Sequence, residues 1–213
     1  MPMKPEPEPL LKLGVLISGS GTNLGAILSA IEAGRLAARV ELVISNRADA
    51  FGLERAAKAG VATKILPHRE FGSRELFDQA LVAALQGAGV EWVVLAGFMR
   101  VVTSVLLDAF PDRVLNVHPA LLPSFPGVDA QAQALAYGVS WTGCTVHFVD
   151  SGVDTGPVIV QKVVPVLADD DRETLAKRIL VEEHQALVEA LGLIAAGRIE
   201  VEPGPRRRVR VRS

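Results

Sequence analysis

At 213 residues, 49% of them hydrophobic and 22% charged, the chain is long enough to bury a sizeable core and too apolar to be intrinsically disordered. Its formal net charge of −2 gives no overall attraction to nucleic acid or to a membrane surface. Cys144 is the only cysteine, which excludes a disulfide framework or a cysteine zinc site within one chain.

The N-terminal residues 1–11 are rich in Pro and Glu and lack the apolar core of a signal peptide, so we expect a disordered leader. No apolar run in the sequence reaches the roughly 18 residues that are needed to span a bilayer. Both features predict a cytoplasmic protein.

Short apolar runs alternate with helical patterns through the first half of the chain. Strands are expected at 12–18, 40–45, 62–66, 91–96 and 114–118. Helices are expected between them at 24–33, 49–59, 73–86 and 103–110. Strands that alternate with helices form right-handed βαβ units, so the pattern predicts a mainly parallel sheet.

The pattern changes in the second half of the chain. The runs at 145–149 and 156–164 indicate two strands joined by a turn without a helix, followed by a long helix at 172–196. We therefore expect an α/β fold in a single domain over 12–202: a Rossmann-like, mainly parallel sheet flanked by helices, with a mixed or antiparallel later edge. The tail at 203–213 carries five arginines and is expected to be a basic, disordered end.

A glycine-rich loop, Gly19-Ser20-Gly21-Thr22-Asn23, follows the first strand. Glycines let a backbone approach an anion, and the next helix presents unpaired N–H groups to it. Leu24 replaces the third glycine of a dinucleotide fingerprint, and the second strand ends in Asn46 rather than an acidic residue. The loop is either a tight turn that binds nothing or a site for one phosphate of a small metabolite, with Asn23 adding a side-chain contact.

The fifth strand ends in Asn116 and His118, which share one face because they are two residues apart. A glycine-rich loop after a later strand carries Asp154, whose carboxylate could orient the imidazole. These side chains are either structural polar groups or an oxyanion donor, a general acid and an orienting carboxylate. No candidate nucleophile accompanies them, so the pattern favours direct attack by a substrate group on a carbonyl carbon.

The remaining candidate ligands are given structural interpretations. His147 is interpreted as a structural or supporting residue, His68 as a solvated loop residue, His184 as a surface or helix-packing residue, and Cys144 as a core residue. Their spacing does not match zinc sites such as His-Glu-x-x-His, so no metal is expected.

The chain resembles the phosphoribosylglycinamide formyltransferase family over about residues 12–200. The resemblance rests on five motifs in continuous order: S-G-S-G-T-N, S-N-R-A-D-A-F-G-L-E-R-A, V-L-A-G-F-M-R, L-N-V-H-P-A-L-L-P-S-F-P-G and G-C-T-V-H-F-V-D-x-G-V-D-T-G-P. It implies transfer of a formyl group from 10-formyltetrahydrofolate, as co-substrate, to the amine of 5-phosphoribosylglycinamide. His118 would be the proton donor, Asn116 would support the oxyanion, and Asp154 would tune and orient His118.

The resemblance also implies the ligand positions. The phosphate and ribose of the ribonucleotide would meet Gly21, Thr22, Asn23 and Glu183. The folate would meet Arg74, Met99, Arg100, Val101, Val102 and the loop that begins at Asp150. The chain departs from similar enzymes at 128–131, which lacks their histidines, and at Leu180, which replaces a polar residue of some relatives. We expect no nucleic-acid or membrane partner, and a monomer or a homodimer.

Other functions are less consistent with the sequence than formyl transfer to the ribonucleotide. A formyltransferase acting on methionyl-tRNA would need a nucleic-acid-binding domain after residue 200, and a formyl-folate hydrolase would need a regulatory domain before the first strand. A non-catalytic nucleotide or folate sensor could share the fold. The joint presence of Asn116, His118 and Asp154 argues against a sensor, while Leu24 and Asn46 argue against a dinucleotide-dependent dehydrogenase.

Overall fold

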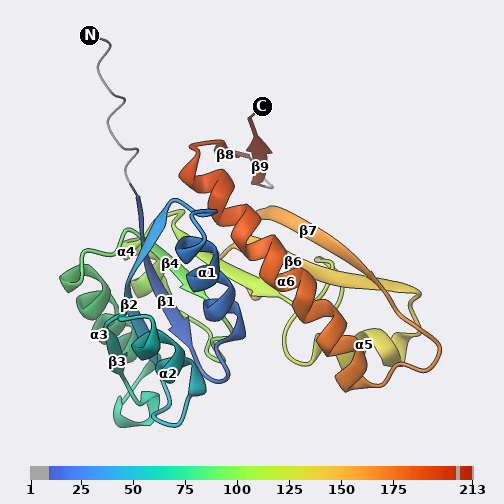
Figure 1. Ribbon diagram of the computed structural model, residues 1–213, viewed down its shortest axis with the longest axis horizontal. Helices are drawn as coiled ribbons and strands as arrows, with labels where there is room; N and C mark the ends of the chain where they lie inside the picture. The colour runs from blue at the N-terminus through green and yellow to red at the C-terminus, as the bar shows by residue number, and fades with distance from the viewer. Residues whose placement is uncertain (1–9, 205–206, 213) are drawn as a thin grey trace.

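The computed structural model describes residues 10–204 and 207–212 (Figure 1). A seven-stranded sheet, in the order β3-β2-β1-β4-β5-β6-β7, forms its centre. The parallel strands are β1 (Leu11–Ile17), β2 (Ala38–Ser45), β3 (Thr63–Ile65), β4 (Trp92–Leu95) and β5 (Val114–His118). The antiparallel edge consists of β6 (Trp141–Phe148) and β7 (Val158–Pro165). The predicted α/β fold with an antiparallel later edge is confirmed.

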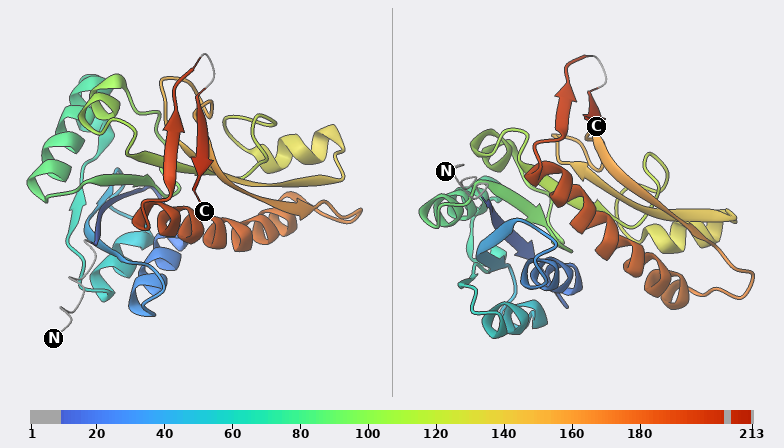
Figure 2. Two further views of the ribbon diagram at one scale, coloured as in Figure 1. Left: turned by 90° about the horizontal axis from the view of Figure 1, so that it is seen from above. Right: turned by 45° about the horizontal axis from the view of Figure 1, so that its top comes forward.

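Helices cover both faces of the sheet. They are α1 (Thr22–Glu32), α2 (Phe51–Lys58), α3 (Arg74–Gly87), α4 (Ser104–Ala109), α5 (Ala130–Tyr137) and α6 (Arg172–Ala195), with a short 3-10 helix η1 at His68–Glu70. Figure 2 shows α1, α2 and α6 on one face and α3 and α4 on the other. This arrangement leaves the carboxyl ends of the parallel strands free to carry polar side chains.

Two hydrophobic cores follow from the alternation of side chains along the buried strands. Val15 of β1 packs in one core with Ile27 of α1 and Leu187 of α6. Its neighbour Leu16 packs in the other core with Leu81 of α3 and Leu106 of α4. The continuous apolar runs of the sequence therefore reflect strands that are buried on both faces.

The long helix α6 crosses the face of the sheet beside β6 and β7 (Figure 1). Asp171 starts it with a capping box, in which its carboxylate accepts the Thr174 N–H while the Thr174 hydroxyl accepts the Asp171 N–H. Glu183 lies in the middle of the helix among its buried positions. A charged residue there requires a local partner, and this partner lies in the candidate site.

The predicted disordered tail is wrong for its described part. Strand β9 (Arg208–Val211) pairs antiparallel with β8 (Ile199–Glu202), so ordered structure extends beyond residue 202. Arg212 pairs with Glu200 at 2.7 Å, and Arg207 reaches Asp112 of the main domain at 2.6 Å. Opposite charges on facing strands and the alternating valines account for the hairpin. Residues 205, 206 and 213 of the predicted tail lie outside the described residues.

Some predicted boundaries also differ from the structure. The first strand begins at Leu11, inside the predicted leader; residues 1–9 of that leader lie outside the described residues. Helix α1 begins at Thr22 rather than 24, so Thr22 and Asn23 belong to its first turn. Helix α5 was not predicted, because its alanines and glutamines give almost no amphipathic pattern.

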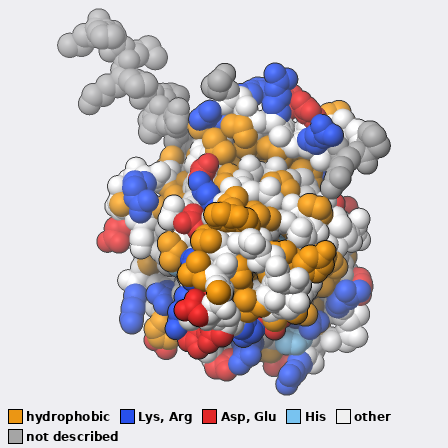
Figure 3. Space-filling model, turned by 90° about the vertical axis from the view of Figure 1, so that its right-hand side faces the viewer, with side chains coloured by type: hydrophobic (Ala, Val, Ile, Leu, Met, Phe, Trp, Pro, Cys, Tyr) orange, Lys and Arg blue, Asp and Glu red, His pale blue; other side chains and the backbone are white. Residues whose placement is uncertain are grey.

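Hydrophobic side chains gather on the face of the molecule at the α5 end (Figure 3). Around α5, the side chains of Val128, Tyr137 and Trp141 are exposed.

Over the two described ranges, no helix has the length and apolar character that crossing a membrane requires. The choice between a monomer and a homodimer stays a prediction.

Candidate active site

Three polar side chains meet where the sheet changes from parallel to antiparallel. Asn116 and His118 project from the end of β5, and Asp154 comes from the turn after β6. The Nδ1 atom of His118 lies 3.3 Å from Oδ2 of Asp154, and the amide of Asn116 donates to Oδ1 of Asp154 at 3.4 Å. The structure thus brings the three predicted catalytic residues together.

Asp154 accepts contacts from several directions. The backbone N–H of Gly127 donates to its Oδ2 at 2.8 Å, and Nε2 of His147 lies 3.6 Å from its Oδ1. Burial by itself raises the pKa of Asp154, but the hydrogen bonds from His147 and Gly127 and the charge of His118 leave this pKa below its usual value. The left-handed backbone at Asp154 (φ 54°) shows that the surrounding contacts hold it in an unfavourable conformation.

His147 is a fourth member of this cluster. Its Nδ1 atom donates to the carbonyl of Phe148 at 2.8 Å, and its Nε2 atom lies 3.3 Å from the Asn116 amide nitrogen. The antiparallel pairing of β5 and β6 places His147 directly opposite Asn116. The sequence analysis assigned His147 only a structural or supporting role, since strand register is not visible in the sequence.

The second ring nitrogen of His118 also has a partner. Its Nε2 atom lies 2.8 Å from the carbonyl oxygen of Phe125. A carbonyl oxygen can only accept, so Nε2 carries a hydrogen in this contact. The backbone of the loop after β5 therefore contacts the atom that faces away from Asp154.

The glycine loop is tightly packed between β1 and α1. Gly21 has a left-handed backbone (φ 64°), and a Cβ there would lie 2.6 Å from the Cα of Gly52. The N–H of Gly52 donates to the Gly19 carbonyl at 3.0 Å, and Nε of Arg55 donates to the Ser20 carbonyl at 2.9 Å. The sequence analysis did not single out Arg55, which brings a positive charge to the loop.

Asn23 and Glu183 form a buried pair although 160 residues separate them. The Asn23 amide donates to the Glu183 carboxylate at 2.8 Å. Burial raises the pKa of Glu183, and the hydrogen bond from Asn23 offsets this only in part. The Oδ1 atom of Asn23 is buried and has no hydrogen-bond partner among the described residues. That orphaned acceptor fits a hydroxyl donor better than a phosphate.

Replacing Glu183 with Gln is expected to raise the free energy of unfolding by roughly 1 kcal/mol at neutral pH. The folded state holds the Glu183 proton above its ordinary pKa of 4.5, so the wild-type protein loses stability as pH rises from there through the raised value. Glutamine keeps an acceptor for Asn23 without this titration. Chemical denaturation across pH, with exposed Glu32→Gln as the control, measures the difference; a less stable Gln variant at neutral pH would contradict it.

The predicted folate segment, Met99 to Val102, follows β4 and is fixed near both ends. The N–H of Met99 donates to the Ser18 hydroxyl at 2.8 Å. Beyond the segment, the Thr103 hydroxyl donates to Asp78 of α3 at 2.8 Å. The side chains of Met99 and Val101 are exposed. The segment therefore offers apolar surface, while the backbone donor of Met99 is already in use.

The other two predicted folate residues are Asp150, in the turn after β6, and Arg74, at the start of α3. Oδ1 of Asp150 accepts from the Gly152 N–H at 3.0 Å and from the Thr155 hydroxyl at 2.6 Å, so it shapes its own turn. Arg74 is the exposed first residue of α3, after the Ser73 cap. Among the described residues, no hydrogen bond joins Asp150 or Arg74 to the Met99–Val102 segment.

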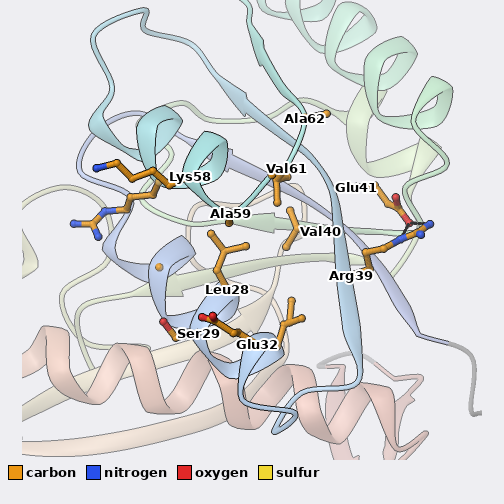
Figure 4. A pocket seen from close by; sticks show the side chains of 14 residues that line it. Leu28, Ser29, Glu32, Arg39, Val40, Glu41, Lys58, Ala59, Val61 and Ala62 are labelled. Atoms are coloured by element: carbon orange, nitrogen blue, oxygen red, sulfur yellow. Dashed lines mark hydrogen bonds and ion pairs between the residues drawn. The ribbon is translucent and has the colours of Figure 1, made fainter.

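A groove of about 950 Å³ lies between α1, α2 and β2 (Figure 4). Its lining includes Leu28 and Glu32 of α1, Arg39 of β2 and Lys58 of α2, and none of the predicted site residues. We locate the site by the polar cluster at the strand ends instead, because the groove holds no comparable set of converging side chains. In the described ranges, no group of three or more His, Cys, Asp or Glu residues is arranged to hold a metal ion.

The fold is an α/β domain in which the end of β5, the strand β6 and the turn after β6 bring one Asn, two His and one Asp together. The formyl transferase family model matches residues 11–191, so the chain belongs to that family. It is 41% identical over 191 residues to the phosphoribosylglycinamide formyltransferase of Escherichia coli (strain K12), with 90% of each chain covered. The family predicted from the motifs is confirmed.

Two further comparisons agree. The crystal structure of glycinamide ribonucleotide transformylase 1 from Symbiobacterium toebii matches with a TM-score of 0.93 and 54% identity, covering 96% of this chain and 95% of that one. The trifunctional purine biosynthetic protein adenosine-3 of Drosophila pseudoobscura pseudoobscura is 49% identical over 192 residues, which are 89% of this chain. The chain spans only 14% of that relative's length.

Proposed function

We propose that this chain transfers the formyl group of 10-formyltetrahydrofolate to the amine of 5-phosphoribosylglycinamide in purine biosynthesis. The observation that carries the proposal is the contact of 3.3 Å between His118 and Asp154 beside Asn116. The similarity to the phosphoribosylglycinamide formyltransferase of Escherichia coli and to the glycinamide ribonucleotide transformylase of Symbiobacterium toebii supports the same reaction. No metal takes part in the proposed chemistry.

The proposed reaction needs no nucleophile from the protein. The amine of the ribonucleotide attacks the formyl carbon, and the carbonyl oxygen becomes an oxyanion in the tetrahedral intermediate. The Asn116 amide and the His118 imidazolium stabilise this oxyanion, for which Nε2 of His118 exchanges its contact with the Phe125 carbonyl. As the bond between the formyl carbon and the folate nitrogen breaks, His118 gives a proton to that nitrogen, and the attacking amine loses a proton, which restores the imidazolium. Asp154 orients the ring and stabilises its charged form. Asn116 reaches the oxyanion by exchanging one of its present contacts, to Asp154 or to His147.

Two ligand sites on either side of the cluster complete the proposal. The N–H groups of the Gly19–Asn23 loop and the start of α1 bind the phosphate, and Arg55 supplies a positive charge next to them. Asn23 and Glu183 bind the ribose hydroxyls. The folate lies along Met99–Val102, with Arg74 and the Asp150 turn approaching when it binds.

The Asn23→Ala variant is expected to raise KM for the ribonucleotide about tenfold, because the loss of a buried hydrogen-bond partner costs on the order of 1–2 kcal/mol. KM for the formyl folate is expected to change by less than about twofold, since Asn23 faces only the ribonucleotide in the proposal. Steady-state kinetics with each substrate varied in turn measures both values. Ser29→Ala, on the same helix, is the control. A change confined to KM for the folate would refute this role of Asn23.

A transfer assay with competing acceptors tests the proposed function itself. The protein is given 10-formyltetrahydrofolate with 5-phosphoribosylglycinamide, with methionyl-tRNA, or in buffer alone. We expect rapid formation of the formylated ribonucleotide and only background rates with the other two. Equal or faster loss of the formyl group to water or to methionyl-tRNA would overturn the proposal.

A further inference from the structure

The backbone from Phe125 to Asp129, which we name the 125–129 loop, contacts two ionisable members of the cluster, His118 and Asp154. The Phe125 carbonyl accepts from Nε2 of His118, and the Gly127 N–H donates to Oδ2 of Asp154, each at 2.8 Å. Both contacts come from main-chain atoms. The position of the loop backbone, rather than the identity of its side chains, therefore determines them.

The loop backbone is not in a relaxed conformation. Phe125 (φ 53°), Gly127 (φ 81°) and Asp129 (φ 56°) all have left-handed backbones. For a non-glycine residue this conformation costs on the order of 1 kcal/mol. Two such residues in five make the loop dependent on contacts from outside it.

Gln133 of helix α5 provides such contacts. Its side-chain amide nitrogen donates to the Pro126 carbonyl at 3.1 Å and to the Val128 carbonyl at 2.9 Å. Gln133 therefore binds the Pro126–Gly127 peptide and the Val128–Asp129 peptide, which lie on either side of the Gly127–Val128 peptide. Gln133 is half-buried, and both hydrogen bonds lie near the protein surface.

A second contact holds the end of the same loop. Nε of Arg172, the first residue of α6, lies 2.6 Å from Oδ1 of Asp129. The side chains of this pair are 67% and 43% exposed, so their ion pair adds little to stability. Tyr137 of α5 packs edge-on against the Phe125 ring, with the ring centroids 5.8 Å apart, whereas the Gln133 amide contacts main-chain atoms of the loop on either side of Gly127.

We infer that Gln133 is a positioning residue for the His118–Asp154 pair. It holds the 125–129 loop so that the Gly127 N–H keeps the Asp154 carboxylate ionised and the Phe125 carbonyl fixes the His118 ring. Gln133 itself contacts neither reacting group. The consequence for catalysis rests on the proposed formyl transfer. The contact of the 125–129 loop with Asp154 is a property of the protein alone.

NMR of the amide of Gly127 tests whether Gln133 maintains the contact between Gly127 and Asp154, and it needs no substrate. In the wild-type protein, its chemical shift is expected to follow the ionisation of Asp154 as pH is lowered. Gln133→Met keeps the side-chain length and removes both donors, so the shift is expected to lose this pH dependence. Gln133→Glu, which at neutral pH presents only acceptors to the two carbonyls, is expected to show the same loss. Gln131→Met, on the same helix, is the matched control and is expected to behave like the wild-type protein.

Formyl-transfer kinetics of the same variants tests the consequence. For Gln133→Met, kcat is expected to fall about tenfold, with both KM values within about twofold, because ground-state binding is untouched. Without the Gly127 N–H, the pKa of Asp154 rises, so the acid limb of kcat moves to higher pH. A wild-type Gly127 titration in both Gln133 variants, or lower kcat without a moved acid limb, would overturn the inference. If the wild-type protein transfers no formyl group, the proposed function fails. The Gly127 titration then still tests whether Gln133 maintains the contact between Gly127 and Asp154.

Discussion

Replacing His118 by alanine is expected to lower kcat for formyl transfer by about 10²- to 10⁴-fold, the range that a general acid contributes. In the proposed mechanism, the His118 imidazole both stabilises the oxyanion and delivers a proton. The ribonucleotide is expected to bind within about threefold of its wild-type affinity, because its proposed contacts lie on the Gly19–Asn23 loop and on Glu183.

Single-turnover kinetics and calorimetric titration of the ribonucleotide check the two halves of this expectation separately. A variant that binds the ribonucleotide normally and has lost turnover supports His118 as the proton donor. Unchanged turnover would remove His118 from the mechanism. Loss of binding together with turnover would place His118 in the ribonucleotide site instead.

Replacing Asp154 by asparagine is expected to lower kcat by about 10²- to 10⁴-fold, as other exchanges of a histidine-orienting aspartate do. The substitution removes the negative charge that faces His118. It also disturbs the neighbours, because both carboxylate oxygens now accept hydrogen bonds, one from the Gly127 N–H and one from the Asn116 amide. An asparagine side chain can accept at only one of these positions.

The pH dependence of stability gives a second readout of Asp154→Asn. The folded-state pKa of Asp154 is below its ordinary 3.8, so the stabilisation from this carboxylate is full above that value and is lost as pH falls through the lowered pKa. The Asn variant is expected to lack this loss below about pH 4. Exposed Asp169→Asn is the control for kinetics and for stability. Wild-type kcat in Asp154→Asn would contradict the orienting role.

The sequence predicted the sheet because its strands are buried on both faces. Residues such as Val15 and Leu16 pack into different cores, which produces the continuous apolar runs that mark buried parallel strands.

The disorder predicted for the tail was wrong for its described part because two features of its sequence favour different structures. The alternation of Arg with Val209 and Val211 has the two-residue period of a strand, but the charge and proline content of the tail favoured disorder.

The sequence identified the residue types that form the site, but it did not identify the neighbouring residues that hold them in position. The spacing of Asn116 and His118 placed them on one face, and the glycine-rich loop marked Asp154. The role of His147 depends on strand register. The role of Gln133 depends on left-handed backbone at Phe125 and Asp129, and of these two only the aspartate is a residue type that favours that conformation.

The pairing of Asn23 with Glu183 was not predicted, although the family resemblance implied a ribonucleotide contact for each residue separately. Their contact depends on the packing of α1 against α6, and no spacing rule links two residues so far apart. The orphaned Oδ1 of Asn23 is likewise visible only in three dimensions. This unpaired acceptor is the reason that we propose a ribose contact for Asn23 instead of the predicted phosphate contact.

The proposed function places one reaction centre, at His118, between two ligand sites. A structure of the protein with both ligands bound would show this arrangement. The protein would be crystallised with 5-phosphoribosylglycinamide and a folate analogue that carries a non-transferable carbon in place of the formyl group. We expect the phosphate on the Gly19–Asn23 loop, and the amine within about 3.5 Å of that carbon and next to His118. A folate bound in the groove between α1 and α2, or a phosphate away from the loop, would contradict the claim.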